Sequence, residues 1–117
     1  MTEYQELAIH DAGEVTVVEF RRPRITAIEE IEQTGRELYG LVETENRTKL
    51  VLDFTAVQAI SSAMFGKLIV LNGKVKARNG AMRLCNLGPE VADSFHVCKL
   101  DQIFDIRQDE GDSLPRF

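Results

Sequence analysis

The stretch that most constrains the fold runs from Leu50 to Gly80, because its hydrophobic period changes part-way along. Residues 50–52 form a short apolar run that is typical of a buried strand, and residues 53–60 read as a loop. From Ser61 onward, apolar residues recur at helical spacing while lysines and an arginine occupy the other side. The apolar positions are Met64, Leu68, Leu71 and Val75. The pattern predicts a strand, a loop and then a helix that begins at or near Ser61.

Two adjacent serines open this predicted helix. Ser61 suits the N-cap position, where its hydroxyl can accept a hydrogen bond from a first-turn N–H group that has no partner inside the helix. Ser62 then lies in the first turn, near the positive end of the helix dipole, and is expected to face solvent. Capping alone accounts for most such pairs, so the serines by themselves do not define a functional site.

The segments after the helix extend the pattern. Asn79-Gly80 is a helix stop, residues 81–86 read as a strand, Gly88-Pro89 opens a further helix, and residues 100–106 follow. Taken with the serine helix, this order resembles the STAS domain of bacterial anti-sigma factor antagonists, without a gap from about Leu50 to Ile106. The resemblance is weaker before Leu50.

The resemblance implies a site at the start of the serine helix. The phosphorylatable serine of the family falls on Ser62, with Ser61 as the second choice, and the second glycine of its motif falls on Gly66. Three positions depart, because Ser61 replaces an aspartate, Ala63 replaces a serine and Met64 replaces a glycine. The expected partner-binding residues are Ser61, Ser62, Ala63, Met64, Phe65 and Lys67.

The family mechanism is a partner switch that regulates transcription. The unphosphorylated protein binds an anti-sigma factor, which is often also a serine kinase of the histidine-kinase-like ATPase fold. Phosphorylation at Ser62 would break that complex by adding charge to the docking surface, and a serine phosphatase would reset it. Two alternatives stay open: a constitutive, non-phosphorylated STAS interaction module in a signalling assembly, and a small-ligand-binding STAS domain.

Before the central stretch, residues 1–24 are expected to form a hairpin and a basic loop. Strands at Tyr4–His10 and Glu14–Phe20 flank a turn at residues 11–13, and the arginine-rich residues 21–24 read as a solvated connection. Thr26 and Glu29 fit a capping box for a helix from about Ala27. The expected apolar face of this helix is Ile28, Ile31, Leu38, Leu41 and Val42, with Gly35 permitting close packing.

After residue 88, the third helix is expected to turn Val91, Phe95 and Cys98 inward, and residues 103–106 to form a last short strand. Residues 108–117 read as a polar tail or a short helix. The sequence therefore predicts an α/β chain, a single STAS domain over residues 1–117. Its single mixed β-sheet would have about four to five strands, with helices packed mainly on one face.

Composition and motifs narrow the function further. At 117 residues and 44% hydrophobic, the chain can bury one core, and a net charge of −5 disfavours nucleic acid and anionic membranes as partners. Without a signal or membrane-spanning pattern, a cytoplasmic location is expected. Cys85 and Cys98 read as reduced core thiols. His10 and His96 are remote from the serines in sequence, and no nucleophile, metal or phosphate-loop motif is present, so no enzyme, metal or cofactor is expected.

Overall fold

The computed structural model describes residues 4–114 and 117, and its main sheet has five strands. In spatial order these are β1 (Leu7–Ala12), β2 (Val15–Phe20), β4 (Lys49–Asp53), β6 (Ala81–Cys85) and β7 (Asp105–Arg107). The β1–β2 pair is antiparallel, and every later pair is parallel. The predicted mixed α/β sheet is confirmed.

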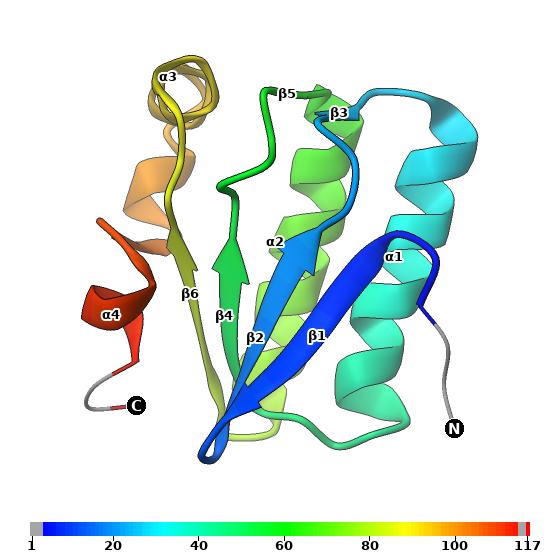
Figure 1. Ribbon diagram of the computed structural model, residues 1–117, viewed down its shortest axis with the longest axis vertical. Helices are drawn as coiled ribbons and strands as arrows, with labels where there is room; N and C mark the ends of the chain where they lie inside the picture. Colours follow the sequence, from blue (N-terminus) through cyan, green and yellow to red (C-terminus); the bar gives the residue numbers. More distant parts are fainter. Residues whose placement is uncertain (1–3, 115–116) are drawn as a thin grey trace.

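Helices supply the crossovers between the parallel strands (Figure 1). They are α1 (Ile28–Glu43), α2 (Ser62–Ala77), α3 (Pro89–Val97), the 3₁₀ turn η1 (Leu100–Gln102) and the short α4 (Glu110–Ser113). Because α1 and α2 each follow a strand of the parallel part, both begin at the edge of the sheet where these strands end. None of the helices within the described residues is both long and apolar enough to cross a membrane.

Two short strands form a second sheet that the sequence did not predict. β3 (Arg24–Ile25) lies just before α1, β5 (Ala59–Ile60) lies just before α2, and the two pair in parallel. This pairing ties together the segments that lead into the two helices (Figure 1). At two residues each, the strands are too short to give a hydrophobic period that sequence analysis can detect.

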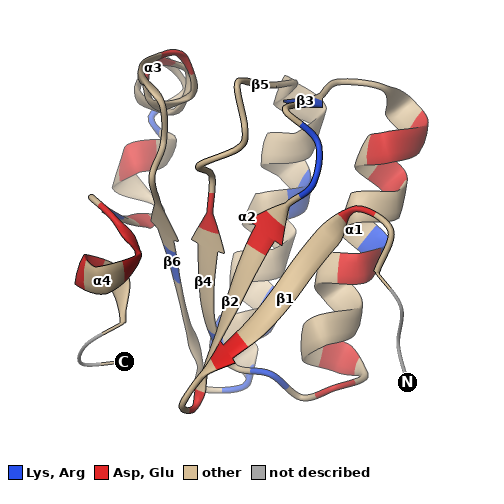
Figure 2. Cartoon of the chain, viewed as in Figure 1, with Lys and Arg blue, Asp and Glu red and all other residues tan. Residues whose placement is uncertain are grey.

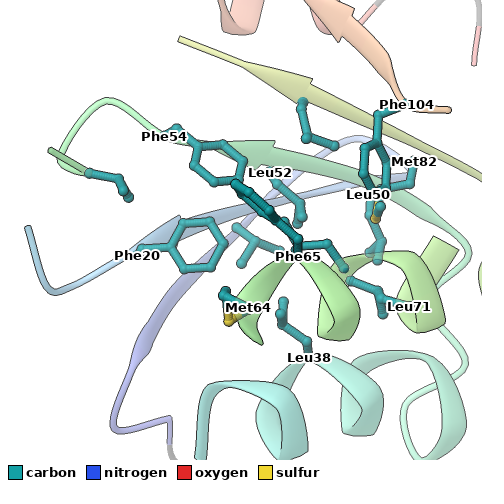
Figure 3. Packing of buried hydrophobic residues seen from close by; sticks show 14 of the residues in the cluster. Phe20, Leu38, Leu50, Leu52, Phe54, Met64, Phe65, Leu71, Met82 and Phe104 are labelled. Carbon is teal, nitrogen blue, oxygen red and sulfur yellow. The ribbon is translucent and has the colours of Figure 1, made fainter. Parts of the chain in front are cut away.

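The main core lies between the sheet and helices α1, α2 and α3. Alternate strand residues point to this side, and the helices contribute one stripe each. Figure 3 shows part of this cluster, in which Leu50 and Leu52 of the central strand meet Met64 and Leu71 of α2. All four apolar positions predicted for the serine helix are fully buried, so the predicted face is confirmed.

The opposite face of the sheet has a smaller cluster of Val15, Val17, Val51 and Cys85. The C-terminal segment covers it, with Leu114 and Phe117 packed against these side chains. Buried Arg83 helps to hold the segment, since its Nη1 donates to the Ser113 carbonyl at 2.8 Å and its guanidinium lies 4.2 Å from the centre of the Phe117 ring. The short helix that the sequence allowed at the C-terminus is therefore present as α4.

Several predicted boundaries were wrong by one to three residues. The first strand runs from Leu7 to Ala12 rather than from Tyr4 to His10. The hairpin turn is Gly13–Glu14, with Gly13 at φ 65°, rather than residues 11–13. Helix α1 starts at Ile28, so Ala27 is the N-cap, and its N–H donates to Glu30 Oε1 at 3.4 Å in place of the predicted box. At this position Ile28 is 74% exposed, and its assignment to the apolar face was wrong.

Two expectations near the C-terminus also need correction. Cys98 follows the last residue of α3 and is exposed, so only Cys85 is a core thiol. The last strand begins at Asp105, because η1 occupies residues 100–102 and leaves Ile103 47% exposed. In both places a helix ends just before the residue in question, and the apolar pattern of the sequence does not show where it ends.

Candidate functional site

The N-terminus of α2 is held by its backbone. Ser61 is the N-cap, as predicted, with φ −85° and ψ 157°. Its N–H donates to the Ile25 carbonyl of β3 at 3.0 Å, and its carbonyl accepts from the Met64 N–H at 3.0 Å. The Ser61 hydroxyl makes no capping hydrogen bond, so that part of the prediction was wrong. The serine turn is thus fixed through main-chain contacts, and the side chain of Ser61 is left uncommitted.

Ser62 is the first residue of α2, and it is exposed as the sequence predicted. The next residue, Ala63, is also exposed. The Ser62 hydroxyl forms no hydrogen bond with any residue that the structure describes. A modifying enzyme would therefore reach this hydroxyl without breaking an existing contact.

Met64 and Phe65 point the other way, into the core. Met64 is fully buried and Phe65 is 6% exposed. The Phe65 ring packs edge-on against Phe95 of α3, with the ring centres 4.9 Å apart and the planes at 71°. Both side chains lie on the face of α2 that packs into the core, because helical spacing turns them away from Ser62 and Ala63. Their expected contact with a partner stays a prediction.

Lys67 belongs to the contact between α1 and α2. A side chain at Gly35 would place its Cβ 3.0 Å from Lys67 Cδ, so the glycine leaves room for the lysine stem, as the predicted close packing requires. Lys67 Nζ pairs with Glu32 at 3.1 Å, and the Tyr39 hydroxyl donates to the Lys67 carbonyl at 3.3 Å. Among the expected partner-binding residues, this leaves Ser61, Ser62 and Ala63 as the surface at the helix start.

A hydrogen-bonded cluster of Asp53, Thr55 and Asn86, called the polar knot below, holds the loop that leads to these serines. Asp53, the last residue of β4, is 6% exposed. Its Oδ1 accepts from the Thr55 N–H at 2.9 Å, the Thr55 hydroxyl at 2.5 Å and the Asn86 amide at 3.1 Å. A buried carboxylate is retained only with such partners. The knot therefore sets the direction in which the chain leaves β4 toward Ser61.

A family model of the STAS domain matches residues 9–113. The chain belongs to the STAS domain family. Among solved structures it is similar to an anti-sigma factor antagonist from Mycobacterium paratuberculosis, with a TM-score of 0.81 at 21% identity over 92% of this chain and 89% of that chain. No curated protein sequence matches this chain.

Two further solved structures share the fold. An anti-sigma-factor antagonist (STAS) domain protein from Planctomyces limnophilus gives a TM-score of 0.78 at 19% identity, over 90% of this chain and 92% of that chain. The Bacillus cell fate determinant SpoIIAA in its phosphorylated form gives 0.68 at 15% identity, over 90% and 94%. These matches establish that the three chains have the same STAS fold.

The basic loop of this STAS domain is largely structural. Arg22 pairs with Glu6 at 2.5 Å, and this hydrogen bond raises the pKa of the guanidinium. Arg21 Nε donates to the Leu7 carbonyl at 2.7 Å. Arg24, on β3, is exposed. Arg21 and Arg22 thus tie the segment after β2 to the start of β1, and Arg22 also pairs with Glu30 of α1 at 2.9 Å. Spacing alone could not reveal these contacts, because the partners are remote in sequence.

Other titratable groups of the STAS domain are engaged away from the serines. His10 contacts Glu110 at 3.3 Å, and His96 contacts Asp101 at 2.8 Å, which raises the pKa of His96. Burial raises the pKa of the Cys85 thiol to about 11, which keeps it protonated and unreactive at neutral pH.

One grouping escaped sequence analysis. Glu19, Asp53 and Glu110 each bring one carboxylate oxygen within 4.8 Å of the others. They come from β2, β4 and α4, and no spacing along the chain signals the arrangement. Asp53 is already committed to the polar knot, and the group lies on the face that α4 covers, so it takes no part in the serine site.

Proposed function

We propose that this STAS domain is an anti-sigma factor antagonist whose binding is switched by phosphorylation of Ser62. Its partner would be a cytoplasmic anti-sigma factor with a histidine-kinase-like ATPase fold that acts as the serine kinase, and a serine phosphatase would reset the switch. The observation that carries the proposal is the exposure of the Ser62 hydroxyl, without a hydrogen-bond partner among the described residues, at the first position of α2.

The physical effect of phosphorylation follows from this position. A phosphate at Ser62 would add roughly two negative charges beside the small side chains of Ser61 and Ala63. Inside the free domain the positive end of the α2 dipole would favour that charge. In a complex the same charge must lose water or repel acidic groups, so binding weakens while the fold remains intact.

The relatives support the same reading. The Mycobacterium paratuberculosis protein is described as an anti-sigma factor antagonist, and SpoIIAA has been solved in unphosphorylated and phosphorylated forms. The kinase that acts on this chain would have to accept Ser61 at the position where the family carries an aspartate. That departure favours a second candidate, a constitutive docking module that is never phosphorylated.

Mass spectrometry of the protein from its native cells tests the proposal. We expect one phosphate on the wild type that persists in Ser61→Ala and disappears in Ser62→Ala. The Ser62→Glu variant should retain its thermal stability and lose binding to the anti-sigma factor that the wild type captures. A phosphate that follows Ser61 would move the site by one residue, and no phosphate under any growth condition would leave the constitutive module.

A further inference from the structure

A surface groove separates the loop after β4 from the first turns of α3. One cavity of about 500 Å³ is lined on one side by Val57 and Gln58 and on the other by Pro89, Glu90 and Val91. A second cavity of about 110 Å³ shares Gln58, Glu90 and Val91 and extends the groove along β5. The two together form one channel whose wall, on one side, is strand β5.

Within residues 4–114 and 117, no strand pairs with the edge of β5 that lies toward this groove. The N–H groups of Ala59 and Ser61 donate to the carbonyls of Pro23 and Ile25, at 3.1 and 3.0 Å, on the β3 side. Successive residues of a strand point their backbone groups to opposite sides, so the N–H and carbonyl of Ile60 point away from β3. Figure 1 shows β5 between β3 and α3, which places this edge toward α3.

Nothing in the sequence of β5 blocks pairing at this edge. Exposed strand edges are usually protected by charged residues, by proline or by a cover. The β3 side of the small sheet has both devices, with Pro23 before the strand and Arg24 within it, whereas residues 58–60 contain neither. Figure 2 shows no charge along the chain from the loop after β4 through β5. The edge remains able to accept another strand.

The charge of the groove indicates the composition of a segment that could pair with β5. Glu90 is exposed in the first turn of α3, and its carboxylate makes no ion pair or hydrogen bond with any residue that the structure describes. Val57 and Val91, which are 3% and 2% exposed, give the groove an apolar floor. The chain as a whole carries a net charge of −5. A complementary segment is therefore extended, with apolar side chains on one face and at least one basic side chain.

We propose that an extended, basic segment of a protein partner adds to β5 as a further strand in this groove. Its backbone pairs with Ile60, its apolar side chains cover Val57 and Val91, and its cation lies beside Glu90. Strand addition of this kind takes its affinity from main-chain hydrogen bonds and its specificity from the side-chain contacts. The proposal does not depend on modification of Ser62, which lies outside the groove lining.

The test uses the full chain labelled with ¹⁵N and an acetylated, amidated hexapeptide of alternating lysine and valine. We expect its addition to shift the backbone amide signals of Ile60, Glu90 and Val91, while the matching glutamate–valine peptide leaves them in place. Glu90→Lys should weaken binding by about fivefold, the scale of an exposed ion pair. Asp93→Lys is the matched control, because it makes the same charge change on an exposed residue of α3 that does not line the groove.

Ile60→Pro tests the strand geometry, since it removes the N–H that points into the groove and spares the bonds to β3. If the circular dichroism spectrum of this variant matches that of the wild type, peptide binding should be lost. If the variant does not fold, the comparison of Glu90→Lys with Asp93→Lys tests the proposal instead. Ser62→Ala should bind the peptide like the wild type. Four results would overturn the proposal. Both peptides could bind equally, or Glu90→Lys and Asp93→Lys could weaken binding equally. The signal shifts could be confined to other surfaces, or the groove could prove to be a contact between two copies of this chain.

Discussion

Replacing Phe65 by alanine separates a core role from a docking role for this side chain. The ring is 6% exposed and packs against Phe95, which in turn contacts Phe54 and Phe104 with ring centres 6.2 and 5.9 Å apart. Removing a buried phenylalanine costs about 3–5 kcal/mol, because transfer energy is lost and the cavity only partly collapses. A docking residue on the surface would change stability by less than about 0.5 kcal/mol.

The size of this loss can be converted into a melting shift. For 117 residues the entropy of unfolding is about 0.25 kcal/mol/K, so each kcal/mol lowers Tm by about 4 °C. Phe65→Ala should therefore melt about 12–20 °C below the wild type, and urea unfolding followed by circular dichroism should give the same free-energy loss. Ile69→Ala is the matched control, since Ile69 lies on the same helix and is 42% exposed.

One result would refute this reasoning. If Phe65→Ala lost less than about 1 kcal/mol of stability, like Ile69→Ala, and yet failed to bind the proposed anti-sigma factor partner, the ring would belong to the docking surface. The buried cluster in Figure 3 would then not explain why a phenylalanine is needed at position 65. The outcome also bears on Ser62, because the buried stripe of α2, to which Phe65 belongs, orients the helix so that the serine faces solvent.

Three further predictions concern packing, thiol reactivity and pH. Gly80→Ala should destabilise the domain by about 3 kcal/mol or more in urea unfolding, because its Cβ would lie 2.1 Å from the Thr48 carbonyl oxygen and the backbone must move. A thiol reagent should label one cysteine of the native protein at pH 8 and leave Cys85 unmodified until the protein unfolds. The pKa of His96 in an NMR titration should exceed its ordinary value and should fall in Asp101→Asn, which removes the largest cause of the increase. The small stabilisation by this pair should be present below the ordinary pKa and lost as pH rises through the raised one.

The turn that carries Ser62 is held in place by contacts to three other parts of the domain. The polar knot at Asp53, the backbone bond from Ser61 to β3 and the ring of Phe65 each hold a different part of the turn. A phosphate placed there would act on whatever docks rather than on the fold. β5 lies just before this turn and beside α3 (Figure 1). Ser62 and the groove would therefore lie at the same end of the molecule, near the edge of the sheet where the parallel strands end.

Local sequence determined the elements and their inward faces. The change of period after residue 60 set α2 and its buried stripe, Gly13 and Asn79 took the positive φ angles that their turns need, and Pro89 opened α3. These features depend on residues three or four apart, where backbone preference and side-chain spacing act directly. For this reason the order of strands and helices, and the exposure of Ser62, could be predicted from the sequence.

The tertiary structure decided what depends on residues far apart in the chain. Ile28 has the spacing of the apolar stripe of α1 and is nevertheless exposed, because it is the first residue of the helix and the core does not extend over it. No local pattern shows how far the core extends along a helix. The pairing of β3 with β5, the knot between Asp53 and Asn86 and the burial of Phe65 against α3 each join segments that only folding brings together. The sequence by itself determined that the two serines would lie at the start of α2, and tertiary packing decided which of the neighbouring side chains reach the surface.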